Sequence, residues 1–216
     1  MEPFDTVAGR GRASFEIRGS EFIGRVAPAD SVAAAEAFVA EVREAHADAT
    51  HNVPAYRVPA DGATAGDAPA AVDAPAAERP MLREYGDDDG EPSGSAGDPA
   101  LNVLQQRGLR NVVAVVTRYY GGTNLGVGGL ARAYARGVQD AVADAGVTRR
   151  RPRETVVAAV EYDDSGDVRA VLESEGVDFD AEYATEVTFE VRVPADRARP
   201  LRDRLRSATS GRVDLG

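Results

Sequence analysis

The chain has 216 residues and a net charge of −11, with 36 acidic side chains against 25 basic ones, all arginine. It contains no cysteine, which excludes disulfides, thiolate nucleophiles and cysteine-based metal sites. No stretch is apolar for long enough to span a membrane, and the first residues do not read as a signal peptide. We therefore expect a cytoplasmic protein with no membrane partner.

The first part of the chain predicts two short strands, a helix and a third strand. Residues 14–19 and 21–28 alternate apolar and polar side chains, as half-buried strands do. Apolar residues recur at helical spacing over 31–47, where Asp30 is the expected N-cap. A further strand is predicted at 51–58.

Residues 59–86 differ in kind from what precedes them. They are rich in alanine, proline, glycine and aspartate and lack apolar periodicity, so we expect a flexible insertion. A turn-rich acidic loop and a short helix over 99–107, capped by Asp98, are expected next. The β-branched run at 111–117 predicts a strand buried on both faces.

The helix predicted over about 130–145 completes an N-terminal domain that we assign to residues 1–148. The RRRPR run at 149–153 is expected to be a linker to a second domain, residues 149–216. There the pattern gives strand, helix, two strands, helix and a short last strand. This β-α-β-β-α-β order over about sixty residues predicts a ferredoxin-like domain. Its strands are acidic, which argues against RNA on their sheet face.

The segment TRYYGGTNLGVGGLARAY, residues 117–134, is the strongest candidate site. A glycine-rich loop between a buried strand and a helix leaves backbone N–H groups and the positive end of the helix dipole free for an anion. The spacing fits neither a P-loop nor a dinucleotide motif. Arginine and tyrosine can stack on bases, and one of two successive tyrosines should be exposed. The candidate anion- or nucleic-acid-binding residues are Arg118, Tyr119, Tyr120, Gly121, Gly122, Asn124, Gly126, Gly128, Gly129 and Arg132.

Residues 99–139 contain no acidic side chain. With 36 acids among 216 residues, a stretch of 41 would hold about seven on average, yet this one carries five arginines instead. We interpret the stretch as a surface that faces an anion or a polyanion. The structural alternative is that these arginines pair with acidic neighbours elsewhere in the fold.

A second loop, residues 87–97, contains four acids and two serines. Carboxylates are ligands for Mg²⁺ or Ca²⁺, but the spacing is not that of an EF-hand, and a solvated turn is favoured. The serines lack the partners of a hydrolase triad, and for His51 a hydrogen-bonded structural role is favoured over a catalytic one. We assign no catalytic residue, metal or cofactor. The candidate second loop of the site comprises His51, Asp88, Asp89, Glu91, Ser93 and Ser95.

The blocks HNVPAYR, DDGEPSGSAG and VVTRYYGGTNLGVGGLARAY resemble, in this order, the signature blocks of the IMPACT (YigZ-type) family, and the resemblance covers about residues 14–146. The tail resembles the C-terminal domain of the two-domain prokaryotic members, and the acidic, lysine-free composition suggests a halophilic archaeon. Val53 stands where the family often has Cys, and Asn124 where it often has Lys. Residues 59–86 exceed the family's usual spacing.

The resemblance implies an α+β fold: a split β-α-β sandwich domain similar to domain IV of elongation factor G and a small-subunit ribosomal protein, followed by the ferredoxin-like domain. It implies a role in translation or its regulation, through RNA, the ribosome or a regulatory protein partner, more than an enzyme activity. The alternative is a phosphate-ligand or nucleotide-binding enzyme, in which the glycine-rich loop and the acidic loop converge around Mg²⁺.

Overall fold

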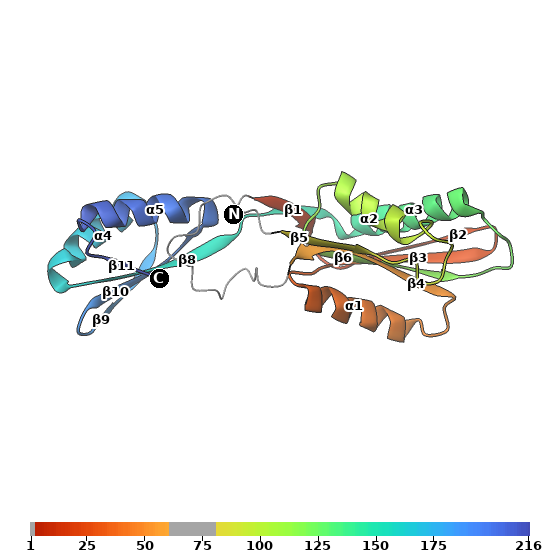
Figure 1. Cartoon of the computed structure of the whole chain (residues 1–216), viewed down its shortest axis with the longest axis horizontal. Coiled ribbons are helices and arrows are strands. Elements are labelled where there is room, and N and C mark those ends of the chain that lie inside the picture. Colours follow the sequence, from red (N-terminus) through yellow and green to blue (C-terminus); the bar gives the residue numbers. More distant parts are fainter. Residues whose placement is uncertain (1–2, 61–80) are drawn as a thin grey trace. The chain divides into compact units, whose positions relative to one another are not determined.

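The computed structural model describes residues 3–60 and 81–216, and these form two compact units. One contains residues 4–60 and 81–150, and the other is Arg151–Gly216. Each combines helices with a mainly antiparallel sheet (Figure 1), so the predicted α+β class is confirmed. Most of the expected insertion lies outside the described residues. Within the described ranges, no helix has the length and apolar character needed to cross a bilayer.

The N-terminal unit is built on a five-stranded antiparallel sheet with the strand order β2-β3-β6-β4-β5. The central strand β6 is the predicted β-branched run, and it is buried along nearly its whole length. A separate antiparallel pair is formed by β1 and β7. The bounds are β1 (Phe4–Val7), β2 (Gly11–Ile17), β3 (Ser20–Pro28), β4 (His51–Pro59), β5 (Leu82–Gly86), β6 (Val112–Tyr119) and β7 (Val147–Arg150).

Helices cover both faces of this sheet (Figure 1). α1 (Val32–Ala45) packs on one face, and α2 (Gly97–Gln106) and α3 (Val127–Ala145) pack on the other. Alternate residues of β6 serve the two apolar cores, which explains why the strand is apolar throughout. Because α1 joins β3 to β4 and β6 lies between them, the expected split β-α-β unit is present.

Glycines allow α3 to lie unusually close to the sheet. A Cβ atom on Gly24 of β3 would lie 2.0 Å from the carbonyl oxygen of Gly137 in α3. A Cβ on Gly11 of β2 would lie 2.3 Å from the carbonyl oxygen of Ala141. The backbones therefore meet where no side chain fits. This contact sets the position of Tyr134, which lies one turn before Gly137 and is fully buried.

Two predicted helix caps are wrong. Ser31, not Asp30, caps α1, because its side chain accepts the N–H of Ala34 at 3.2 Å. Asp98 lies in the first turn of α2 and makes no capping hydrogen bond. The glycine-rich segment is also shorter than expected as a loop, since α3 begins at Val127 and includes the last two glycines.

Two predicted connections are partly strands. Residues 82–86, expected to be part of the insertion, form β5, because they pair with β4 along the edge of the sheet. The expected linker overlaps β7, which pairs with β1 through residues 147–150. Neither pairing follows from local sequence, since both strands are short and poor in apolar residues.

The C-terminal unit confirms the predicted ferredoxin-like order. Its four strands are arranged β11-β8-β10-β9, with every neighbour antiparallel. Both helices lie on one face of the sheet (Figure 1), where alternate side chains of the strands form a single apolar core. A short 3₁₀ turn (Tyr162–Asp164) precedes the first of them. The elements are β8 (Arg153–Val160), α4 (Ser165–Ser174), β9 (Phe179–Tyr183), β10 (Val187–Pro194), α5 (Ala195–Ala208) and β11 (Asp214–Leu215).

Replacing Gly24 with alanine should destabilise the N-terminal unit, because the new methyl group would need space held by the backbone of α3. Overpacking costs about 1–3 kcal/mol in general, and a backbone obstacle favours the upper end. Gly9→Ala is the matched control, since a Cβ there meets nothing within 4 Å. Denaturant unfolding checks this; equal loss in both variants would contradict the close contact.

Candidate functional site

Segments far apart in the sequence meet at one end of the N-terminal sheet. His51 begins β4, and the sheet register places it opposite Arg118 near the end of β6. Glu91, from the acidic loop between β5 and α2, contacts Arg118 directly. From α3 comes Tyr134, which also contacts Glu91. The acidic loop and the strand that leads into the glycine-rich loop are thus joined through side chains.

Glu91 is the centre of this cluster. Its side chain is only 4% exposed, and its Oε1 accepts hydrogen bonds from Arg118 Nη1 and from the Tyr134 hydroxyl, both at 2.7 Å. The Arg118 side chain is 6% exposed, so the two charges neutralise each other in a buried setting. Burial, and then the bond to Glu91, raise the pKa of Tyr134, which keeps it a neutral donor.

His51 lies beside this ion pair in a defined orientation. Its Nδ1 is 2.7 Å from the backbone carbonyl oxygen of Asp89. A carbonyl only accepts, so Nδ1 carries the proton and Nε2 is turned toward Glu91, 3.9 Å from its Oε1. Asp89 and Gly90 both have positive φ, at 50° and 86°, and this turn brings the carbonyl to the imidazole.

Asp88 organises the acidic loop instead of facing solvent. Its carboxylate accepts the backbone N–H groups of Gly94, Ala96 and Gly97 at 2.7, 2.9 and 2.8 Å, and so holds the start of α2. Burial alone would raise the pKa of Asp88, but the three N–H donors together bring it below its ordinary value. This carboxylate therefore takes the place of a conventional helix cap.

Asp89 is also occupied within the fold. Its carboxylate accepts the N–H of Asn52 at 2.6 Å and pairs with Arg43 at 2.8 Å. In the part of the chain that the structure describes, no group of three or more His, Cys, Asp or Glu side chains is arranged to hold a metal ion. Ser93 is exposed, whereas Ser95 is fully buried and its hydroxyl has no hydrogen-bond partner among the residues that the structure describes.

The two tyrosines diverge, and the prediction that one of them is exposed is confirmed. Tyr119 turns toward His46, with 2.8 Å between its hydroxyl and Nδ1, and the hydroxyl also lies 3.1 Å from Asp48. Tyr120 is 44% exposed. Arg118 covers its ring at 5.1 Å from the centroid, and its hydroxyl donates to Asn124 at 3.1 Å. Tyr120 is therefore held in place while remaining accessible.

The glycine-rich loop, residues 121–126, is largely exposed and leads into α3 without a side-chain cap. Gly126 occupies the N-cap position with φ of 71°. Gly128 and Gly129 belong to the first turn, and the guanidinium of Arg132 lies over that turn: its Nη1 is 3.4 Å from where a Cβ on Gly128 would be. Gly122 also has positive φ, and Gly121 packs against the backbone of Gly19.

The five arginines of the acid-free stretch have different surroundings. Arg118 is buried against Glu91, Arg136 pairs with Asp140, and Arg110 lies over the ring of Phe4. Two exposed arginines, Arg107 and Arg132, form no ion pair with any described residue. Pairing thus accounts for some of these cations. It leaves one of them, Arg132, beside an uncapped helix N-terminus.

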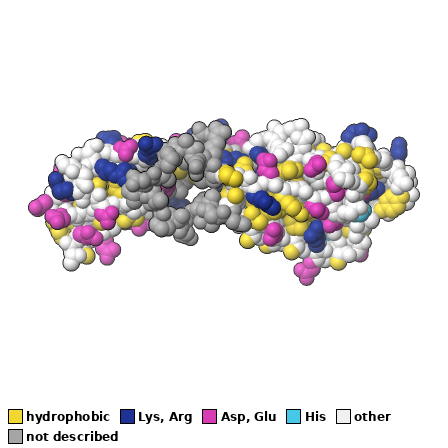
Figure 2. All heavy atoms as spheres, in the orientation of Figure 1, with side chains coloured by type: hydrophobic (Ala, Val, Ile, Leu, Met, Phe, Trp, Pro, Cys, Tyr) yellow, Lys and Arg dark blue, Asp and Glu magenta, His cyan; other side chains and the backbone are white. Residues whose placement is uncertain are grey.

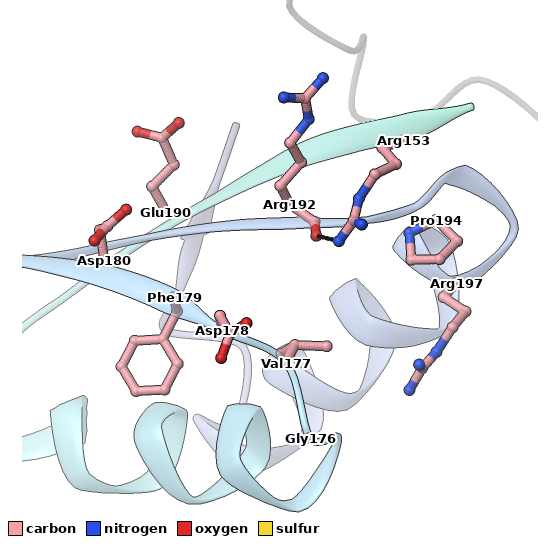
Figure 3. A pocket seen from close by; sticks show the side chains of 10 residues that line it. All are labelled: Arg153, Gly176, Val177, Asp178, Phe179, Asp180, Glu190, Arg192, Pro194 and Arg197. Atoms are coloured by element: carbon pink, nitrogen blue, oxygen red, sulfur yellow. Dashed lines mark hydrogen bonds between the residues drawn. The ribbon is translucent and has the colours of Figure 1, made fainter. Parts of the chain in front are cut away.

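The C-terminal unit has a hollow of its own, of about 540 Å³. Glu190 and Arg192 extend from β10 to the same side of the sheet, and Asp180 lies opposite Glu190 on the neighbouring strand β9 (Figure 3). Arg153 donates to the carbonyl oxygen of Arg192. Three arginines and three carboxylates line the hollow, so it has no excess of positive charge. Acidic and basic side chains are likewise mixed on the face shown in Figure 2.

Sequence reasoning missed Tyr134 and Ser20 as parts of the cluster. Tyr134 falls on the buried stripe of α3, and a tyrosine there usually needs a partner for its hydroxyl, which is the signal that could have found it. Ser20 accepts the N–H of Gly121 at 3.1 Å and lies 3.4 Å from Arg118 Nη2. No sequence pattern marks it.

Changing Asp88 to asparagine should lower stability at neutral pH by about 1–2 kcal/mol, through loss of a charged acceptor for three N–H groups at a helix start. Because the folded pKa of Asp88 is depressed, its contribution is complete above the unfolded pKa of about 3.9 and is lost as the pH falls through the folded value. Urea unfolding at several pH values should show the two proteins converging in acid. A constant difference would contradict the role.

Replacing Glu91 should lower the free energy of unfolding more than removing the hydroxyl of its neutral partner, Tyr134. Glu91→Ala leaves the Arg118 charge buried and unpaired, which costs about 3–5 kcal/mol. Tyr134→Phe removes one hydrogen bond to a charged group and should cost about 1.5–3 kcal/mol. Denaturation midpoints of the two variants test the order. The reverse order would show that the ion pair is not the principal contact.

Comparisons with known proteins cover both units. Residues 18–142 match the Impact N-terminal domain, and residues 159–212 match a domain of unknown function (DUF1949). A solved structure described only as a hypothetical protein shares 32% identity, with a TM-score of 0.64, and covers 100% of this chain and 97% of its own.

Two bacterial relatives align over nearly their whole length. IMPACT family member YigZ of Escherichia coli (strain K12) is 34% identical over 203 residues, which is 93% of this chain and 90% of the relative. IMPACT family member YvyE of Bacillus subtilis (strain 168) is 30% identical over 216 residues, 100% of this chain and 91% of the relative. The match to the Impact N-terminal domain covers more than half of the chain, and both relatives are at least 30% identical over nearly all of it. The chain therefore belongs to the IMPACT family.

Proposed function

We propose that the protein binds RNA of the translation machinery in the cytoplasm, and acts in translation or its regulation rather than as an enzyme. The binding surface is the phosphate face, defined as residues 120–128 together with Arg132. The observation that carries the proposal is the position of Arg132. Its guanidinium has no ion pair among the described residues and lies over the uncapped first turn of α3.

This arrangement suits a phosphate group. The first N–H groups of a helix have no intrahelical acceptor, and the helix dipole adds partial positive charge at the same place. A neighbouring guanidinium supplies a full charge and several donors. The chain carries a net charge of −11, so RNA is repelled on average and must be held by such a local site.

Tyr120 gives the phosphate face a surface for a base. Arg118 covers one side of its ring, the bond to Asn124 fixes its hydroxyl, and the side chain remains 44% exposed. An aromatic ring held in this way loses little entropy when a base stacks on its free side. Arg118 itself is buried against Glu91, so we assign it to holding Tyr120 and not to phosphate contact.

The metal-dependent alternative has less support. Three acidic residues are the candidate Mg²⁺ ligands. Two of them, Asp88 and Asp89, already accept hydrogen bonds from backbone N–H groups. The third, Glu91, is neutralised by Arg118. A nucleotide-binding enzyme built on these loops would have to break contacts on which the loop conformation depends.

Arg132→Ala should reduce co-sedimentation with ribosomes prepared from the organism's own cells at its native salt. Loss of one phosphate contact should also lower the slope of log affinity against log salt, measured with single-stranded RNA, by about one. Arg107→Ala is the matched control, because Arg107 is also exposed and without an ion pair among the described residues, but it lies at the C-terminal end of α2, outside the phosphate face.

The control should sediment like the unmodified protein. Equal losses in both variants would mean that net charge matters and the phosphate face does not. If the unmodified protein neither sediments with ribosomes nor binds RNA, the proposed function is wrong.

A further inference from the structure

Beside the phosphate face lies a small polar niche, formed by Glu91 and His51. Glu91 uses Oε1 for Arg118 and Tyr134, and its Oε2 accepts no hydrogen bond from any described residue. Neither Glu91 Oε2 nor His51 Nε2 is a fully buried atom without a hydrogen-bond partner. Both atoms therefore reach solvent, although the Glu91 side chain as a whole is 96% buried.

Both open atoms are hydrogen-bond acceptors. Glu91 is held as a carboxylate by a buried guanidinium and a neutral hydroxyl donor, so its free oxygen offers lone pairs only. In the neutral imidazole, the bond from Nδ1 to the Asp89 carbonyl leaves Nε2 without a proton. The separation of 3.9 Å between Nε2 and Oε1 is too long for a hydrogen bond between them. The niche lacks a donor.

The niche and the phosphate face are joined through Arg118. Arg118 gives a direct measure of the separation: its Nη1 lies 2.7 Å from Glu91 Oε1, and its Cζ lies 5.1 Å from the centroid of the Tyr120 ring. With a C–N bond of about 1.3 Å between these two atoms, the Glu91 carboxylate lies within about 9 Å of the Tyr120 ring. One or two nucleotides of a single strand bridge such a distance.

We propose that this niche binds a ribose 2′-hydroxyl of the RNA whose phosphate lies on the phosphate face, with the hydroxyl donating to Glu91 Oε2 beside His51 Nε2. The inference rests on the function proposed above and makes it specific for RNA over DNA. A hydroxyl is the donor that a nucleic-acid strand offers on its sugar, and it separates RNA from DNA. A second phosphate is excluded here, because it would face a carboxylate.

The ligand itself can be changed while the protein stays intact. Binding is measured by fluorescence anisotropy for three single strands of one sequence: RNA, 2′-fluoro RNA and DNA. Fluorine keeps the RNA-like sugar but cannot donate. Loss of a hydrogen bond to a charged acceptor corresponds to at least about tenfold weaker binding, so RNA should bind about tenfold tighter than the other two.

Two protein variants then locate the effect. In Glu91→Gln, Arg118 and Tyr134 pin the amide oxygen at the Oε1 position, so an NH₂ group replaces the acceptor in the niche. The preference for RNA over 2′-fluoro RNA should fall to about one- to threefold, with melting curves confirming the fold. Arg132→Ala should weaken all three ligands equally and keep the preference.

The outcomes separate this inference from the proposed function. If the unmodified protein binds RNA and 2′-fluoro RNA equally, the niche does not read the hydroxyl, while the phosphate face still stands. A preference that survives Glu91→Gln in a folded protein places the hydroxyl elsewhere and overturns the assignment. If none of the three strands binds, both the niche and the phosphate face are wrong.

Discussion

The buried ion pair between Glu91 and Arg118 is the contact on which this end of the protein depends. It links the acidic loop to the central strand, and through Tyr134 it also links both to α3. A buried charge is tolerated only when its partner is present. Loss of either Glu91 or Arg118 is therefore expected to disturb both the acidic loop and the glycine-rich loop. The same Arg118 covers Tyr120, and this couples the buried pair to the exposed face.

Backbone packing makes this arrangement precise. The contact of Gly24 with Gly137 brings α3 against the sheet, and Tyr134 is thereby held where its hydroxyl meets Glu91. Asp88 then anchors the start of α2 through three N–H groups, which holds the acidic loop over the end of the sheet. The residues that look most chemical in the sequence are therefore divided between two tasks. Asp88 and Asp89 fix the conformation of the acidic loop, while Glu91 and His51 each retain an acceptor atom, Oε2 and Nε2, that no described residue uses.

Much of the fold was predictable because its signals are local. The β-branched run of β6 and the β-α-β-β-α-β order of the C-terminal unit required only periodicity. The strands β5 and β7 were missed because edge pairing in the fold, and not apolar pattern, makes them strands. Likewise, spacing shows that a glycine-rich loop precedes a helix, but not that Arg118 is buried and Arg132 unpaired. Those facts depend on contacts between distant segments.

In a protein of net charge −11, the proposed binding of RNA requires that the attraction for phosphate be confined to a small area of the surface. Ten of its arginines form ion pairs with described acidic residues, and the hollow of the C-terminal unit is lined by equal numbers of arginines and carboxylates. At the phosphate face, helix N–H groups add hydrogen-bond donors at short range without adding a full charge. Backbone donors and base stacking act at contact distance, so they persist where long-range charge is screened by salt.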